Sequence, residues 1–79
     1  MPARVLFDQP TALGKVGRHI RTLVSFSGVP QGTTGQVMQA DPSGDGYTLA
    51  IQWELPEHRA RPLVDWFSKT EYERFFVEI

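Results

Sequence analysis

The chain has 79 residues, a net charge of −1, 41% hydrophobic residues and no cysteine. This length has room for one domain with a small core, and so much apolar sequence excludes a disordered tail. The absence of cysteine excludes disulfides and thiolate zinc sites, and no apolar run approaches the roughly 18 residues of a membrane span. We therefore expect one soluble domain with no membrane partner, held together by packing, to which a homo-oligomer could add.

Residues 1–17 are predicted to form a lead that precedes the main domain. They lack the long apolar stretch of a secretion signal, which favours a cytoplasmic location. Residues 4–7 (RVLF) form a short apolar run that is compatible with an edge strand. Residues 9–17 contain Pro10, Gly14 and Gly17, and these residues predict a connecting loop.

Alternating apolar residues predict three strands in the next part of the chain. Residues 19–26 alternate around β-branched side chains, and the glycine-rich residues 27–35 should then form a loop. Residues 36–41 resume as a short strand that ends in a strong turn signal, PSGDG, over residues 42–46. The clearest alternation covers residues 47–54, so we expect a hairpin between these two strands.

The C-terminal part predicts one more strand, a short helix and a final extended segment. Residues 55–62 lie between two prolines and should form an exposed loop, followed by a strand over residues 62–67. Ser68 stands three residues before Glu71, which is the spacing of a capping box at the start of a helix. Residues 77–79 are predicted to close the chain as a last strand.

These elements predict a mainly β fold, an SH3-like antiparallel barrel of four or five short strands over residues 18–79 with one C-terminal helical turn. The chain resembles SH3-like barrels in two places. Residues 23–26 (LVSF) lead into a loop that resembles the KOW-type signature, through Gly28, Gly32, Gly35 and Val37. Residues 65–79, a strand followed by a polar helical turn, resemble the end of many bacterial SH3-like modules.

The KOW-like resemblance implies RNA binding, but the charges argue for it only weakly. No Lys or Arg lies between Ser25 and Ala40, where a phosphate-contacting loop needs them. An alternative nucleic-acid patch would instead use basic residues outside this loop, with Trp53 or Trp66 available for stacking. Its members are Arg18, Arg21, Arg59 and Arg61.

Catalysis is not expected, because the chain has few groups that suit it. His19 and His58 are the only histidines, and neither stands in a recognised arrangement with a serine nucleophile. Their spacing from Asp65 does not indicate a metal site, so we expect no metal and no cofactor. Plasmid-borne dihydrofolate reductases are SH3-like chains of similar length that form a shared pore from four copies, but their Val-Gln-Ile-Tyr motif is absent. An oligomeric enzyme of that type remains a remote alternative.

Residues 47–79 contain seven of the nine aromatic residues and most of the acids. In the strand over residues 62–67, Asp65 and Trp66 must point to opposite faces. An outward Trp66 would form an exposed patch with Tyr72 or Phe75, whereas an inward Trp66 would leave Asp65 to accept hydrogen bonds from a loop or an arginine. Our leading hypothesis is a non-catalytic module that binds an unidentified protein through Trp66, Asp65, Tyr72 and Phe75.

Overall fold

A hairpin of two long strands forms the centre of the computed structural model, which describes residues 5–26, 28–56 and 62–79. Strands β2 (Thr34–Ser43) and β3 (Gly46–Trp53) pair antiparallel from Gly35 opposite Trp53 to Ser43 opposite Gly46. The two-residue turn places Gly44 at a φ of 58°, a conformation that glycine adopts without strain. The predicted hairpin is therefore confirmed, with both strands close to their expected bounds.

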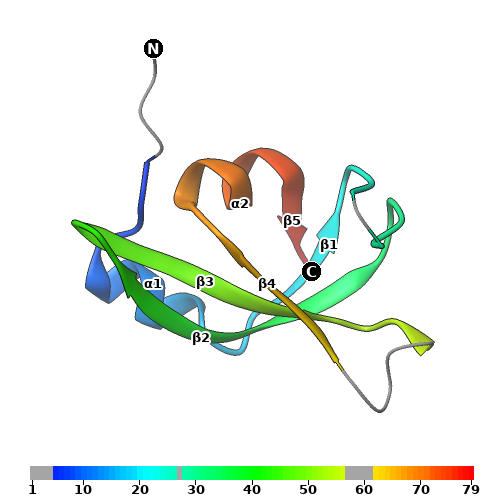
Figure 1. Ribbon diagram of the computed structural model, residues 1–79, viewed down its shortest axis with the longest axis horizontal. Coiled ribbons are helices and arrows are strands. Elements are labelled where there is room, and N and C mark those ends of the chain that lie inside the picture. Colours follow the sequence, from blue (N-terminus) through cyan, green and yellow to red (C-terminus); the bar gives the residue numbers. More distant parts are fainter. Residues whose placement is uncertain (1–4, 27, 57–61) are drawn as a thin grey trace.

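Three shorter strands extend this hairpin into one five-stranded antiparallel sheet (Figure 1). They are β1 (His19–Thr22), β4 (Leu63–Phe67) and β5 (Phe76–Glu78), and the strand order is β4-β3-β2-β1-β5. The mainly β class is confirmed, and the strand order is compatible with an SH3-like fold. The expected closure is not found, because β4 and β5 remain the two edges of the sheet.

The loop predicted over residues 9–17 is wrong, because Gln9–Lys15 form a helix, α1. The Asp8 side chain accepts a hydrogen bond from the Thr11 N–H at 2.8 Å. Hydrogen bonding to the side chain and the N–H of Thr11 lowers the pKa of Asp8. Pro10 lies in the first turn, where its missing N–H costs nothing, and Gly17 follows the helix with a φ of 93°.

The segment predicted as an N-terminal lead contributes side chains to the core. Phe7 forms an isolated antiparallel bridge with Tyr47. This bridge is the part of the edge strand expected at residues 4–7 that the described residues contain. Phe7 and Ala12 are both fully buried in the core. Residues 5–17 therefore belong to the same packed unit as the sheet.

Helix α2 (Lys69–Phe75) begins with the predicted capping box. The Glu71 N–H donates to the Ser68 hydroxyl at 3.2 Å, and the Ser68 N–H donates to the Glu71 carboxylate at 2.8 Å. The helix connects the two edge strands, β4 and β5, and lies above the curved sheet in Figure 1. The strand predicted over residues 77–79 begins one residue earlier, at Phe76.

The strand predicted over residues 19–26 is shorter than expected. It ends at Thr22, whose hydroxyl donates to the Val24 carbonyl at 2.6 Å and accepts from the Val24 N–H at 3.2 Å. This local bonding replaces strand pairing with a turn. Phe26 then forms an isolated bridge with Val29, within the connection between β1 and β2.

The core between the sheet and α2 is dominated by aromatic rings. Trp53 and Phe76 are buried and lie 5.4 Å apart between ring centroids, in an edge-to-face arrangement. Phe67 contacts Phe76 at 4.7 Å, and Phe26 contacts Trp53 at 5.4 Å. These contacts tie β3, β4, β5 and the β1–β2 connection to one cluster.

Candidate functional site

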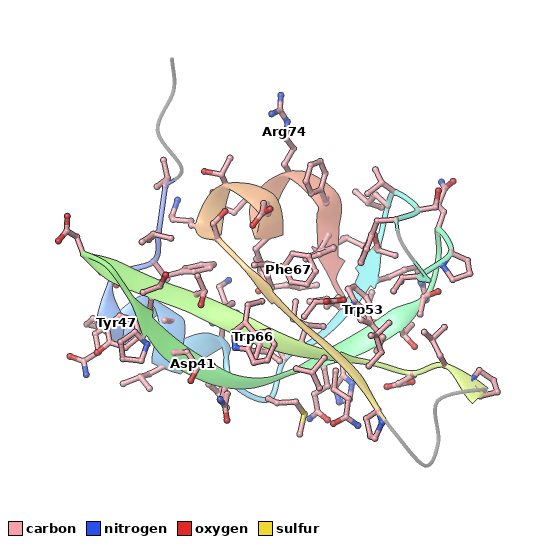
Figure 2. The ribbon with its side chains drawn as sticks, viewed as in Figure 1. Asp41, Tyr47, Trp53, Trp66, Phe67 and Arg74 are labelled. Carbon is pink, nitrogen blue, oxygen red and sulfur yellow. The ribbon has the colours of Figure 1, made fainter. Side chains whose placement is uncertain are left out.

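Trp66 lies on the outer face of the sheet, opposite the core, and is 54% exposed. Its indole N–H donates to the Asp41 carboxylate at 2.6 Å, although β3 lies between the strands that carry the two residues. Figure 2 shows Trp66 on β4 and Asp41 on β2. Ala50, the β3 partner of Trp66, is buried, so the indole lies across β3 over this small side chain. Of the two predicted orientations, the structure therefore has Trp66 outward.

Asp65 lies on the opposite face of β4, between Leu63 and Phe67. Its partner on β3 is Ile51, a core residue. The side chain is partly buried, and among the described residues it forms no hydrogen bond or ion pair. The arrangement predicted for an inward Trp66, in which Asp65 accepts hydrogen bonds, is not seen in this part of the chain.

Tyr72 does not join Trp66 in an exposed patch, because its side chain is buried. The hydroxyl donates to the Glu78 carboxylate at 2.9 Å, and Lys15 from α1 donates to the same oxygen at 2.6 Å. Burial and the hydrogen bond to Glu78 raise the pKa of Tyr72, whereas the hydrogen bond from Lys15 lowers the pKa of Glu78. Tyr72 thus connects α2 to β5 and α1 and leaves no polar atom for a partner.

Phe75 lines an apolar groove between α2 and the β1–β2 connection. The groove has a volume of about 460 Å³. Its lining residues are Val24, Ser25, Phe26, Phe67, Glu71 and Phe75. Val24 is 37% exposed and its neighbour Leu23 is 50% exposed, so two adjacent apolar side chains stand at the rim. Phe26 and Phe67 belong to the aromatic cluster, which gives the groove a rigid floor.

The groove was not predicted from the sequence, although one of its lining residues, Phe75, belongs to the predicted binding surface. Its two walls are more than 40 residues apart in the chain, at residues 24–26 and 67–75, so no local pattern joins them. One signal was present: Leu23 and Val24 are adjacent apolar residues in a segment predicted to alternate. One of two such neighbours on a strand must face away from the core.

Two members of the alternative nucleic-acid patch, Arg18 and Arg21, lie in the described part of the chain. Arg21 is exposed on the outer face of β1, opposite Val77 of β5. Arg18 precedes β1, and its charge acts on Tyr72 and Glu78 near α1. The other two members, Arg59 and Arg61, lie outside the described residues.

Of the groups considered for a metal site, His19 lies on β1 and Asp65 lies on β4. His19 approaches the Glu54 carboxylate at 4.0 Å, with both side chains more than half exposed, and His58 lies outside the described residues. The described residues contain no group of three His, Cys, Asp or Glu side chains able to hold a metal ion. No helix in the same part of the chain has the length and hydropathy to cross a membrane.

The chain was compared with models of protein families, with curated proteins and with solved structures, and none of the three comparisons found a match.

Proposed function

We propose that this chain is a non-catalytic protein-interaction module that binds an apolar side chain of its partner in the groove between α2 and the β1–β2 connection. The groove is the observation that carries the proposal. Four of its six described lining residues are apolar, and three of these are phenylalanines. Concave apolar surfaces with a few polar groups at their margin are typical of binding sites.

The chemistry of the lining favours a protein partner over a nucleic acid. None of the described residues that line the groove is Lys or Arg, so these residues offer no positive charge to a phosphate. Ser25 and Glu71 add polar atoms beside the aromatic floor. Buried aromatic or aliphatic anchors in such pockets supply most of the energy of many protein interfaces.

The SH3-like resemblance supports the same proposal at the level of the fold. The order of the five strands and a helix between β4 and β5 are compatible with it. Small SH3-like subunits attach to larger complexes as accessory proteins, and we propose a role of this kind. The partner would then be a protein of the same compartment that presents an exposed apolar anchor.

A peptide library displayed on phage tests the groove although the natural partner is unidentified. Selection on the wild-type chain should enrich peptides that share one aromatic or large aliphatic residue. Val24→Glu places a charge at the rim of the groove and should weaken these peptides at least tenfold.

Val16→Glu is the matched control, because Val16 is 42% exposed and lies at the end of α1. This variant should bind the selected peptides as the wild type does. Peptides without a common apolar residue, or equal losses in the two variants, would rule out the groove as the binding site.

A further inference from the structure

Strand β4 is an edge of the sheet, and the hairpin shows which of its backbone groups point away from β3. Ser43 and Gly46 close the two-residue turn, so even-numbered residues of β3 bond to β2. The hydrogen bond from the Glu54 N–H to the Thr34 carbonyl, at 2.9 Å, agrees with this alternation. The backbone N–H and C=O groups of the odd-numbered β3 residues therefore point toward β4. The reciprocal backbone hydrogen bonds between Tyr47 and Phe7, on the same side of β3, agree with this direction.

Val64 and Trp66 consequently direct their backbone N–H and C=O groups outward from the edge. Their partners on β3 are the even-numbered Gln52 and Ala50, whose backbone groups bond to β2. Within residues 5–26, 28–56 and 62–79, no hydrogen bond engages the backbone of Val64 or Trp66. The two N–H donors and two C=O acceptors of these residues thus have the spacing that an added strand needs for pairing.

Asp65 stands between these two residues and points to the core face of the sheet. It is partly buried beside apolar neighbours and has no cation or hydrogen-bond donor among the described residues. A residue of an added antiparallel strand directly opposite Asp65 would lie in a non-hydrogen-bonded pair, the closer of the two pair types. The edge therefore combines open backbone groups with one negative charge that has no partner among the described residues.

We propose that the open edge of β4 binds an extended polypeptide segment by antiparallel strand addition, with a Lys or Arg opposite Asp65. The residues on either side of this cation would lie beside Val64 and Trp66 on the outer face and should be apolar. The backbone bonds supply affinity and the alternating side chains supply specificity. This deepens the proposed function, on which it rests only for the polypeptide nature of the partner.

A second copy of this chain is a poorer occupant of the same edge. Two β4 edges that pair antiparallel through all the outward groups of Val64 and Trp66 place Asp65 opposite Asp65 of the second copy. Like charges directly opposite each other destabilise a strand pair. The edge is therefore suited to a segment of opposite charge.

The test uses three synthetic peptides and the full chain, followed by NMR of the backbone amides. The first peptide is acetyl-Thr-Val-Lys-Val-Thr-amide, the second has Glu in place of Lys, and the third carries N-methyl groups on both valines. The first should shift the amide resonances of Val64 and Trp66 and bind about fivefold more tightly than the second. The third should not bind, because it lacks the two donors that face β4.

Asp65→Lys should invert the preference, so that the Glu peptide binds more tightly than the Lys peptide. Asp45→Lys, an equal charge change at the exposed hairpin turn, should keep the wild-type preference. If Asp65→Lys fails to fold, Asp65→Asn should bind the first two peptides equally. The proposal is overturned by absence of binding, by a preference that persists in the Asp65 variants, or by binding of the N-methylated peptide.

Two further measurements distinguish strand addition at β4 from binding in the groove and from pairing with a second copy of the chain. Val24→Glu should leave the binding of the Lys peptide at β4 unchanged, whereas Asp65→Lys should leave the affinity for the groove-binding peptides unchanged. Each of the two proposed sites is therefore tested independently of the other. Sedimentation of the free chain should show a monomer at the concentrations of the titration. A dimer that excludes the Lys peptide would assign the edge to a second copy and contradict the proposal.

Discussion

The two flanks of α2 differ in how completely their side chains are buried or hydrogen-bonded. On the flank that faces α1, the Tyr72 hydroxyl and the Lys15 ammonium both donate to the Glu78 carboxylate, and the Tyr72 ring contacts Phe7. On the groove flank, Phe75 is only partly buried and the adjacent Val24 is exposed. One flank closes the core, whereas the other leaves apolar surface uncovered, and this contrast separates structural residues from those that we propose to bind a partner.

Removal of Phe76 should have the largest effect, because its ring contacts both flanks. It lies 5.9 Å from Tyr72 and 4.7 Å from Phe67. Phe76→Ala should lower the free energy of unfolding by about 3–5 kcal/mol, which threatens a domain of this size. Urea denaturation followed by circular dichroism measures the loss, and Phe76→Leu should retain the fold at a smaller cost. A Phe76→Ala loss below about 1 kcal/mol would show that the two flanks do not share one core.

Ser68→Ala should affect both flanks by loosening the start of α2. The substitution removes the acceptor of the Glu71 N–H from a buried position, at a cost of about 1–2 kcal/mol. Thermal unfolding measures this cost, and Ser68→Asp should recover most of it because Asp is also a good N-cap. An unchanged midpoint in Ser68→Ala would contradict a role of the capping box in stability.

Tyr72→Phe should affect the α1 flank alone. It removes the hydroxyl that donates to Glu78 and retains the ring against Phe7, so the expected loss is about 1 kcal/mol. The groove-binding peptides should keep their affinity, because no lining residue is changed. A loss of peptide binding without a loss of stability would mean that the two flanks are coupled.

The same flank should make stability depend on pH at the acidic end. The hydrogen bond from Lys15 lowers the pKa of Glu78 in the folded state, so the contribution of Glu78 is present above its ordinary pKa of 4.5. It is lost as the pH falls below that value through the lowered pKa. Glu78→Gln should flatten this part of the profile of unfolding free energy against pH. An identical profile in wild type and variant would exclude Glu78 as its source.

Val24→Glu should have the smallest effect on stability, within about 0.5 kcal/mol of the wild type, because the side chain is exposed. Its effect on the affinity for the groove-binding peptides should be large. A substitution on the α1 flank should therefore lower stability and leave peptide binding unchanged, whereas Val24→Glu should do the reverse. Denaturation curves of Val24→Glu and Val16→Glu provide the comparison. A destabilised Val24→Glu chain would indicate that Val24 supports the core.

Local chemistry explains which parts of the fold were predictable. The capping box at Ser68 and Glu71 and the PSGDG turn each depend on neighbours in the chain, and both were predicted correctly. Helix α1 is not predicted because Gly14 and Gly17 indicate a loop, although Asp8 and Pro10 form a helix start. Gly14 is tolerated in the helix, and Gly17 follows its end.

The candidate site was less predictable, because it depends on contacts between distant segments. Asp65 and Trp66 were placed on opposite faces by alternation, yet both faces of β4 carry apolar residues, so their direction stayed open. The buried Ala50, over which the Trp66 indole lies, settles it in the structure. Phe75 was named as a binding residue, whereas its groove needs Val24 and Phe26 from a distant part of the chain.

The contrasting positions of the two tryptophans give this chain a built-in optical readout. Trp53 is 2% exposed in the aromatic cluster, and its indole N–H has no hydrogen-bond partner among the described residues. Trp66 is 54% exposed on the outer face. A collisional quencher in solution should therefore quench the fluorescence of Trp66 before that of Trp53. The fluorescence of Trp53 should change when the core unfolds. Occupation of the outer face and loss of the fold can thus be followed in one sample as two separate fluorescence signals.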